Sequence, residues 1–425
     1  MNAQLDAIAT ARSEPLAIGS GIGGLTAAAL LARYGKKVLV CESHSIPGGA
    51  AHSFSREGFI FDSGPSFYCG LGTRHPSLNP LKQVLDVLGE SLEVPQLNTI
   101  AASVGQVMDE SVSDSWVRRL LDLECFLLSG LKAHGTVAPE VAFMLGERTR
   151  AGVEYPVGGS GAIVQALVRG LKKWGGELRL RAHVDKILVE AGQVTGVKLR
   201  DGEILQSPIV ISNATIWDTY GKLLSPEDLP PAYRQAALAT PAVDSFMHLH
   251  LGIKADGLEE LTGHHVVVHD SDKDITAPGN TCMISIPSVW DKNLAPPGHH
   301  VVHAYTLEPY QNWQKNEAYQ QKKQERAQSL YRALRKIIPD LDNRITLELI
   351  GTPLTHARFL RRDRGTYGPA IAAGKGMFPS CHTPIAGLYR VGDSTMPGIG
   401  VPAVAASGIL CANTLVSPWG DDNQR

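Results

Sequence analysis

Three glycines near the N-terminus have the spacing that binds the diphosphate of a dinucleotide. Gly19, Gly21 and Gly24 satisfy the pattern G-x-G-x-x-G directly after a short apolar run at residues 16–18. The first glycine permits a tight turn, the second lets a pyrophosphate approach the backbone, and the third lets the next helix pack close to the sheet. Because residues 25–33 continue at helical spacing without a proline, the segment predicts a strand, a turn and a helix.

An acidic residue closes this unit. After a predicted strand at residues 37–41, Glu42 lies about twenty residues beyond the glycines, where a carboxylate can accept both hydroxyls of an adenosine ribose. The alternative is an ordinary β-α turn, since a chain with 43 glycines contains such turns by chance. The strand, the helix and the acid around the motif favour dinucleotide binding.

A second pair of glycines allows two interpretations. Gly48 and Gly49 lie in a loop before residues 59–65, which are predicted to form a strand that runs into a turn. Paired glycines let a backbone approach a ligand, but they also suit a plain connecting hairpin. The spacing supports the hairpin and the ligand-binding loop equally.

The C-terminal part carries a third candidate segment. Gly392 and Asp393 follow an apolar strand, which places a carboxylate at the sheet edge where ligands of open α/β sheets bind. A long apolar helix is predicted from Val401, directly after Gly400. Its free amides and positive dipole end would stabilise the negative charge of a reduced flavin.

Other helices and strands are predicted around these segments. Ser160 is expected to cap a helix, and Val184 begins a β-meander with turns at residues 191–193 and 200–203. An apolar strand at residues 209–213 returns to the main sheet. Further helices are predicted at residues 78–88, 109–131 and 317–338, and further strands at residues 178–181, 246–251, 283–286 and 300–305.

Histidines and arginines gather in the second half of the chain. His248 and His250 share one face of a predicted strand, and six more histidines follow within residues 264–303. A metal site is disfavoured, because no carboxylate or cysteine accompanies them at ligand spacing, and no metal is expected. The basic cluster is interpreted as solvated surface, with contact to anionic lipid as the alternative. It consists of Arg358, Arg361, Arg362 and Arg364.

Length and charge limit the classes of protein. At 425 residues the chain exceeds one ordinary core, which indicates two domains. The net charge of −2 gives a nucleic-acid partner no electrostatic support. Six scattered cysteines indicate reduced thiols, and residues 1–15 lack the apolar core of a signal peptide, so we expect a protein that is not secreted. The uncharged stretch 395–419 is too rich in proline and glycine to span a membrane.

Taken together, the motifs resemble the phytoene desaturase-type flavoprotein family, and within it the branch of carotenoid (prolycopene) isomerases and retinol saturases. The resemblance rests on G-S-G-I-G-G-L with Glu42, P-G-G at residues 47–49, F-D-S-G-P at residues 61–65 and V-G-D-S-T-M-P-G-I-G-V at residues 391–401. It extends over nearly the whole chain, including G-T-P-L-T-H at residues 351–356.

This resemblance implies non-covalently bound FAD. The residues that it implies at the pyrophosphate are Gly19, Ser20, Gly21, Ile22, Gly23 and Gly24. It further implies Glu42 at the adenosine ribose, Val184 at the adenine, Gly48 and Gly49 near the ribityl phosphate, Gly392 and Asp393 beside the ribityl hydroxyls, and Gly400 and Val401 beside the isoalloxazine. It identifies no catalytic residue.

The implied fold is α/β, a Rossmann-type FAD-binding domain with a mostly parallel sheet and a β-meander, interleaved with an α+β substrate domain. We expect the FAD-binding domain at residues 1–75, 150–215 and 355–425 and the substrate domain at residues 76–149 and 216–354. Family members usually carry additional elements where this chain crosses residues 91–108. A shortened substrate domain is therefore expected, with either a more open site or impaired catalysis.

The first functional hypothesis is an FAD-dependent oxidoreductase or isomerase that acts on carotenoid- or retinoid-like polyenes, by isomerisation, saturation or desaturation. Because such substrates dissolve in lipid, we expect peripheral membrane contact, in a cytoplasmic or plastid-type reducing compartment. The alternatives are a flavin amine oxidase-like enzyme and a non-catalytic flavin-binding protein. An NAD-dependent dehydrogenase is disfavoured, because the C-terminal half supplies a second cofactor-contacting segment.

Overall fold

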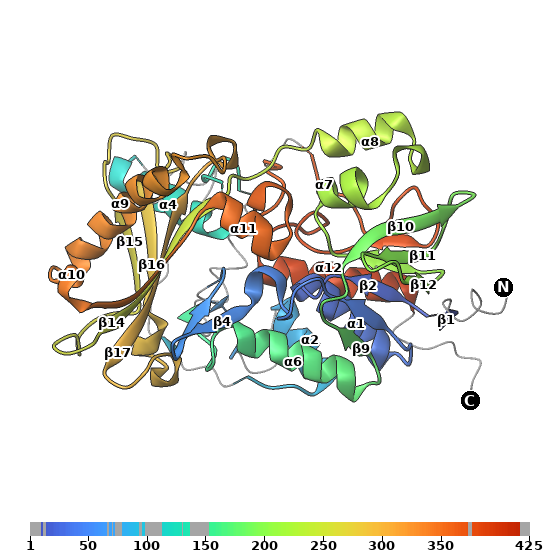
Figure 1. The fold of residues 1–425 in the computed structure, drawn as a ribbon, viewed down its shortest axis with the longest axis horizontal. Helices are drawn as coiled ribbons and strands as arrows, with labels where there is room; N and C mark the ends of the chain where they lie inside the picture. Colours follow the sequence, from blue (N-terminus) through green and yellow to red (C-terminus); the bar gives the residue numbers. More distant parts are fainter. Residues whose placement is uncertain are drawn as a thin grey trace.

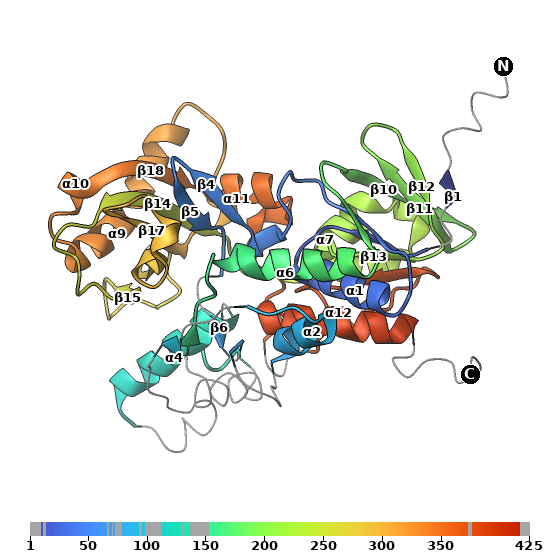
Figure 2. The ribbon, with the colours of Figure 1, turned by 90° about the horizontal axis from the view of Figure 1, so that it is seen from below.

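The computed structural model describes residues 10–11, 14–65, 68–69, 71–72, 79–92, 96–97, 113–129, 131–136, 153–372 and 376–416. The chain forms two lobes that lie side by side (Figure 1). The first lobe, at the right of Figure 1, is built on a parallel sheet, and the second, at the left, on an antiparallel sheet. Seen from below, α4 (Ser115–Ser129) lies at the lower edge of the second lobe (Figure 2).

The parallel sheet has five strands in the order β19-β13-β2-β3-β9. Their bounds are β2 Leu16–Ile18, β3 Leu39–Cys41, β9 Glu177–Arg179, β13 Val210–Ser212 and β19 Leu388–Arg390. Both faces of the sheet are covered, and its inner strands β2 and β3 are accordingly apolar and fully buried. The predicted Rossmann-type sheet is confirmed.

Successive residues of these strands point to opposite faces and enter two separate cores. On one face, Ala17 and Val40 pack among helices. These helices are α1 (Ile22–Arg33), α2 (Pro80–Leu88), α6 (Ser160–Lys173) and α12 (Val401–Leu415). On the other face, Leu16 and Ile18 pack against the meander. Its strands are β10 (Val184–Glu190), β11 (Gln193–Leu199) and β12 (Ile204–Gln206).

The second lobe is organised by an antiparallel sheet in the order β15-β16-β17-β14-β18. Its strands are β14 Phe246–Lys254, β15 His264–Val268, β16 Thr281–Ser285, β17 His299–Leu307 and β18 Ile345–Gly351. Helix α9 (Tyr319–Ile337) covers one face, where Leu249 and Leu251 meet Leu330. The opposite face of β14 carries His248 and His250, as the alternation in the sequence predicts.

A hairpin from the first part of the chain docks on this second sheet. It consists of β4 (Ser53–Arg56) and β5 (Phe59–Asp62). The ring of Phe59 lies so close to Gly252 of β14 that a Cβ at Gly252 would overlap it. Phe61 contributes a second contact, an edge-to-face arrangement with His250 at 5.2 Å between ring centroids. The hairpin therefore belongs to the packing of the second lobe, although it follows β3 in the sequence.

Local predictions differ from the structure at several element ends. Ser160 is the first residue of α6 rather than its cap, because its hydroxyl donates to the carbonyl oxygen of Pro65 at 2.6 Å, and Gly159 stands at the cap position. The strand predicted at residues 37–41 begins at Leu39, where pairing with the short strand β2 starts. The strand predicted at residues 178–181 is β9, which spans Glu177–Arg179 because its pairing with β3 ends at Arg179. The helix predicted at residues 109–131 spans Ser115–Ser129, and residues 109–112 lie outside the described residues.

Two broader expectations keep their status as predictions. The domain boundaries are one, and the shortening at residues 91–108 is the other, since most of that interval lies outside the described residues. In the ranges that the structure describes, no helix combines the length and apolar character needed to cross a membrane. The uncharged C-terminal stretch instead forms α12, which packs against α1.

A pair of substitutions in α2 tests the core of the first lobe. Leu85 is 1% exposed, whereas Val87 on the same helix is 50% exposed. Leu85→Ala removes buried methyl groups and leaves a cavity, so we expect it to lower the free energy of unfolding by about 3 kcal/mol. Val87→Ala should change it by less than about 0.5 kcal/mol. Urea unfolding followed by circular dichroism measures both, and equal effects would contradict the described packing of α2.

Candidate cofactor and substrate site

A cavity of about 1620 Å³ is lined by both lobes. The first lobe contributes the residues that follow β2, β3, β13 and β19, because parallel strands end at one edge of a sheet. The second lobe contributes residues of β14, β17 and α11 (Pro353–Leu360). Ordinary ligand pockets measure about 300–1,000 Å³. This cavity therefore has room for a large cofactor and a second ligand.

The glycine turn after β2 presents main-chain amides to the cavity. Gly19 has a φ of +88°, in the region that favours glycine. No side chain caps α1 at Gly21, so the first amides of the helix are available to an anion. A Cβ at Gly24 would overlap the carbonyl oxygen of Gly19. Glycine at position 24 is thus what lets α1 begin this close to β2.

Glu42 is held at the end of β3 by the same turn. Its side chain is buried, and Oε2 accepts hydrogen bonds from the backbone N–H and the hydroxyl of Ser20 at 2.7 and 2.6 Å. Oε1 accepts from the N–H of His44 at 2.7 Å. The Ser43 hydroxyl also donates to Oε1, at 3.3 Å. A carboxylate has about four lone-pair positions, so a ribose hydroxyl would take the place of this long contact. Its position on the cavity wall agrees with that role.

The second glycine pair lies directly on the first. Gly48 donates its N–H to the carbonyl oxygen of Ser20 at 3.0 Å, and a Cβ at Gly49 would come within 3.1 Å of the Gly21 Cα. Gly48 and Gly49 line the cavity, and the chain continues into the β4–β5 hairpin. The segment is therefore a loop on the cavity wall that leads into a hairpin, and its contact with a ligand stays a prediction.

The C-terminal segment follows β19, which lies on the far side of β13 from β2, and it reaches the cavity at the same end of the sheet. The N–H of Gly392 donates to the Ser407 hydroxyl of α12 at 2.8 Å. Asp393 lines the cavity, where it forms an ion pair with Arg362 and accepts from the Ser394 hydroxyl at 3.1 Å. The motifs did not predict the arginine partner, which comes from the segment after α11.

Most of the predicted cofactor residues line this one cavity. They are Gly19, Gly21, Ile22, Glu42, Gly48, Gly49, Val184, Gly392, Asp393, Gly400 and Val401. Ser20, Gly23 and Gly24 lie behind the wall, where Ser20 binds Glu42 and the two glycines permit close packing. Asn213, which follows β13, also lines the cavity but was not predicted. The sequence signal that could have identified Asn213 is a polar residue directly after a buried strand. The role of each residue toward the cofactor stays a prediction.

Four buried imidazoles form a row behind the cavity wall. They belong to His248 and His250 of β14, His303 of β17 and His356 of α11. Ring centroids lie 4.3 Å apart for His250 and His303, and 5.2 Å apart for His303 and His248. His248 stacks on His356 at 5.0 Å, and His356 stacks at 5.0 Å on Tyr367, which lines the cavity. Among the described residues, no three His, Cys, Asp or Glu side chains are placed to hold a metal ion.

Burial keeps this row of imidazoles neutral. Burial is the largest of the causes that lower the pKa of each ring. The pKa falls to about 4 for His250 and to about 3 for His356. The pKa values of His248 and His303 also lie well below the ordinary value. A hydrogen bond of 2.9 Å joins Nδ1 of His248 to Nε2 of His303, which requires one ring to donate and the other to accept. The wall behind the aromatic residues is therefore uncharged at neutral pH.

Comparison with known proteins identifies the family. Residues 18–85 match the NAD(P)-binding Rossmann-like domain, and residues 101–416 match the flavin containing amine oxidoreductases. The chain belongs to the flavin-containing amine oxidoreductase family. Within this family it is similar to carotenoid isomerases and phytoene desaturases, so the resemblance inferred from the motifs is confirmed.

The similarity to individual relatives extends over nearly the whole chain. Prolycopene isomerase 2, chloroplastic, of an Oncidium hybrid cultivar is 34% identical, with 96% of this chain and 84% of that protein covered. The chloroplastic prolycopene isomerase of Arabidopsis thaliana is 32% identical, with 96% and 83% covered. All-trans-retinol 13,14-reductase of Danio rerio is 25% identical, with 95% and 86% covered.

Solved structures share the fold of this chain. An oxidoreductase from Methanosarcina mazei superposes with a TM-score of 0.67 at 23% identity, over 94% of this chain and 99% of that chain. A variant of putrescine oxidase superposes with a TM-score of 0.65 at 13% identity, over 94% and 97%. These likenesses concern the fold.

FAD fits the residues of the cavity. The amides of α1 suit a diphosphate, Glu42 suits a ribose, and the N-terminus of α12 at Gly400 carries no side-chain cap. Together with the family assignment, this identifies FAD as the cofactor.

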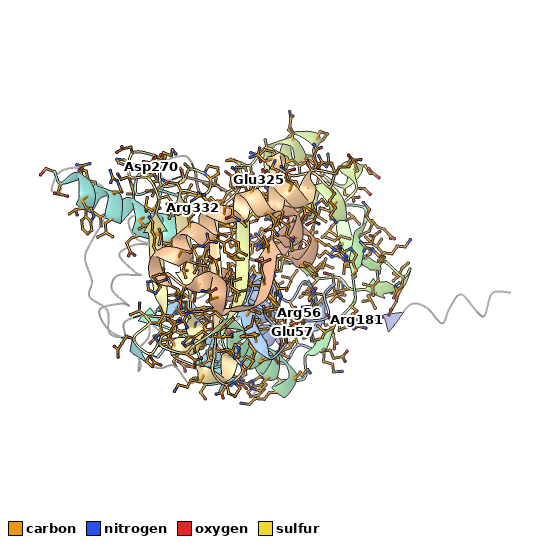
Figure 3. The ribbon with its side chains drawn as sticks, turned by 60° about the vertical axis from the view of Figure 1, so that its left-hand side comes forward. Arg56, Glu57, Arg181, Asp270, Glu325 and Arg332 are labelled. Atoms are coloured by element: carbon orange, nitrogen blue, oxygen red, sulfur yellow. The ribbon has the colours of Figure 1, made fainter. Side chains whose placement is uncertain are left out.

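Substitution of Glu42 tests the ribose site. Glu42→Ala removes the expected ribose acceptor and also the anchor of Ser20, so we expect FAD affinity to fall about tenfold or more. The ratio of flavin to protein absorbance after dialysis measures the loss. Glu325→Ala, on the exposed surface of α9 (Figure 3), is the matched control and should retain FAD. Unchanged flavin content in Glu42→Ala would contradict the assignment.

The buried imidazoles predict acid sensitivity. The pKa of His250 is about 4 in the folded chain but about 6.5 when unfolded, so the unfolded chain binds more protons below pH ~6.5. The free energy of unfolding should therefore decrease as pH falls from about 6.5 toward about 4, by up to about 1.4 kcal/mol per pH unit for each histidine.

Urea unfolding at a series of pH values measures this slope. His250→Gln removes one group that binds a proton on unfolding, so it should reduce the dependence of the unfolding free energy on pH. His382→Gln, at an exposed position, should leave that dependence unchanged. Identical slopes for wild type and His250→Gln would show that His250 titrates normally in the folded chain.

Proposed function

We propose that this chain is an FAD-dependent enzyme that acts on a carotenoid-like polyene, with cis-trans isomerisation as its reaction. The observation that carries the proposal is the 32–34% identity to prolycopene isomerases over 96% of the chain. More distant relatives are named phytoene desaturase and all-trans-retinol 13,14-reductase, which also supports a polyene substrate.

The part of the cavity in the second lobe suits an apolar substrate. Its wall includes Phe126 and Leu127 of α4, Phe246 of β14, Met283 of β16 and Tyr305 of β17. Burial against such side chains favours a hydrocarbon over a polar molecule. A long polyene therefore finds an apolar wall next to the residues expected at the flavin.

The protein contributes shape and electrostatics to this reaction. Bound FAD supplies the capacity to exchange hydride with a conjugated system or to shift charge into it. Tyr367 lines the cavity, and Gly368 packs so close to Ile399 that a Cβ there would come within 3.0 Å of its side chain. This contact keeps the aromatic wall beside the segment expected at the isoalloxazine. The neutral histidines behind that wall add no charge next to the polyene.

Amine oxidation is the second candidate, because the matching family contains amine oxidoreductases. A protonated amine is best bound by an unpaired carboxylate. Asp393 is paired with Arg362, and Asp218 with Lys222, at this cavity. These pairs favour the polyene. A non-catalytic flavin-binding protein is the third candidate.

Peripheral membrane contact belongs to the same proposal. Helix α4 exposes Trp116 and Leu120 to solvent by 64% and 38%, while Phe126 and Leu127 of the same helix line the cavity. Apolar side chains at a surface beside a cavity suit the transfer of a lipid-soluble substrate. We propose α4 as the side from which the polyene enters.

Pigment chromatography tests the reaction. The purified protein is reduced under anaerobic conditions, incubated with a cis carotenoid, and the pigments are separated. We expect conversion to the all-trans isomer while the flavin spectrum stays that of the reduced form. Saturation would instead shorten the chromophore and oxidise the flavin. An unchanged pigment, together with flavin reduction by a polyamine, would favour amine oxidation.

A further inference from the structure

Helix α11 extends from the second lobe to the adenosine end of the cavity. At its C-terminal end, the ring of Phe359 lies 6.4 Å from that of His44, edge to face. Glu42, the expected ribose acceptor, binds the backbone N–H of His44. The end of α11 therefore lies beside the residues that are expected to hold the adenosine.

Two of the arginines at this end are already paired. Arg362 forms an ion pair with Asp393 and donates from Nε to the Thr366 carbonyl oxygen at 2.7 Å. Arg364 forms an ion pair with Asp363 at 2.6 Å. Their charges are balanced within the protein, so they add little attraction for an anionic ligand.

Arg358 and Arg361 differ from Arg362 and Arg364 in their ion pairing. Both are exposed, as expected for the solvated surface that the sequence predicted, and both also line the cavity. Within the part of the chain that the structure describes, neither forms an ion pair with a carboxylate. Arg361 ends α11 in the left-handed region, with a φ of 53° and a ψ of 37°. Many helices end in this conformation, which here turns the chain out of α11.

The expected adenine position holds further charged side chains, with Arg200 in an ion pair with Asp185 at 3.8 Å. His183 precedes Val184, and its Nε2 lies 2.6 Å from Nη2 of Arg200. Burial is the main cause that lowers the pKa of His183, and the charges of Arg200 and Arg361 lower it further. Nδ1 of His183 is buried without a hydrogen-bond partner among the described residues. Arg361 lines the cavity together with His183 and Arg200.

We propose that Arg358 and Arg361 bind the phosphate oxygens of the cofactor diphosphate. The uncapped amides of α1 line the same cavity and attract the same negative charge. Guanidinium groups form strong charge-assisted hydrogen bonds to phosphate. Helix α11 therefore contributes to FAD affinity, although it follows directly on β18 of the second lobe. The phosphate of an anionic lipid headgroup has the same chemistry, and the test separates the two sources.

The first measurement is the release of FAD from the purified holoprotein after dilution. The fluorescence of free FAD reports this release. Arg358→Gln and Arg361→Gln should each raise the Kd for FAD about tenfold, as expected for the loss of one charge-assisted hydrogen bond. Arg361→Lys should recover part of the affinity. Arg332→Gln on the exposed face of α9 (Figure 3) is the matched control and should leave the Kd unchanged.

The dependence of FAD affinity on salt concentration distinguishes phosphate binding by the arginines from a purely structural role. The affinity of the wild type for FAD should fall as NaCl rises, and the double variant should show a shallower dependence. Parallel salt dependences, or an unchanged Kd in the double variant, would overturn the proposal. So would variants that release FAD normally but no longer sediment with phosphatidylglycerol vesicles, because the arginines would then hold lipid phosphate. No polyene enters these measurements, so their outcome is independent of the proposed reaction.

Discussion

The cavity depends on how closely α1 approaches the turn after β2. Gly24 faces the carbonyl oxygen of Gly19 without room for a Cβ, and Gly408 of α12 meets Thr26 of α1, where a Cβ would come within 2.8 Å. These two contacts place α1 between the sheet and α12. As a result, the N-termini of both helices open on the same cavity, one at the expected diphosphate and one at the expected isoalloxazine.

The features that could be predicted from the sequence are those that depend on neighbours in the chain. The glycine turn, the β-α-β unit with Glu42 and the alternation that puts His248 and His250 on one face all follow from spacing within a few turns or strands. The role of Ser160 could not be foreseen, because the carbonyl group that takes its hydroxyl lies in a different segment. Pairing of Arg362 with Asp393 likewise joins segments that only the folded chain brings together.

The two lobes differ in the charge of the side chains that surround the cavity. Around the expected adenosine end, charged side chains line the cavity, including Glu42, Arg200 and Arg361. Toward the second lobe the wall is aromatic, and the imidazoles behind it are kept neutral by burial. One continuous space thus offers a polar environment for a nucleotide and an apolar environment for a hydrocarbon, which is what contact between a flavin and a polyene requires.

The contact between Phe59 and Gly252 limits how this protein can be recombined with its relatives. The hairpin that carries Phe59 precedes every strand of the second sheet in the sequence, yet it completes the packing of that sheet. A chimera that exchanged the second lobe alone would set a foreign β14 against the original hairpin, and any side chain in place of Gly252 would collide with the phenylalanine ring. Exchange of substrate specificity by grafting would therefore have to carry residues 53–62 along with the sheet.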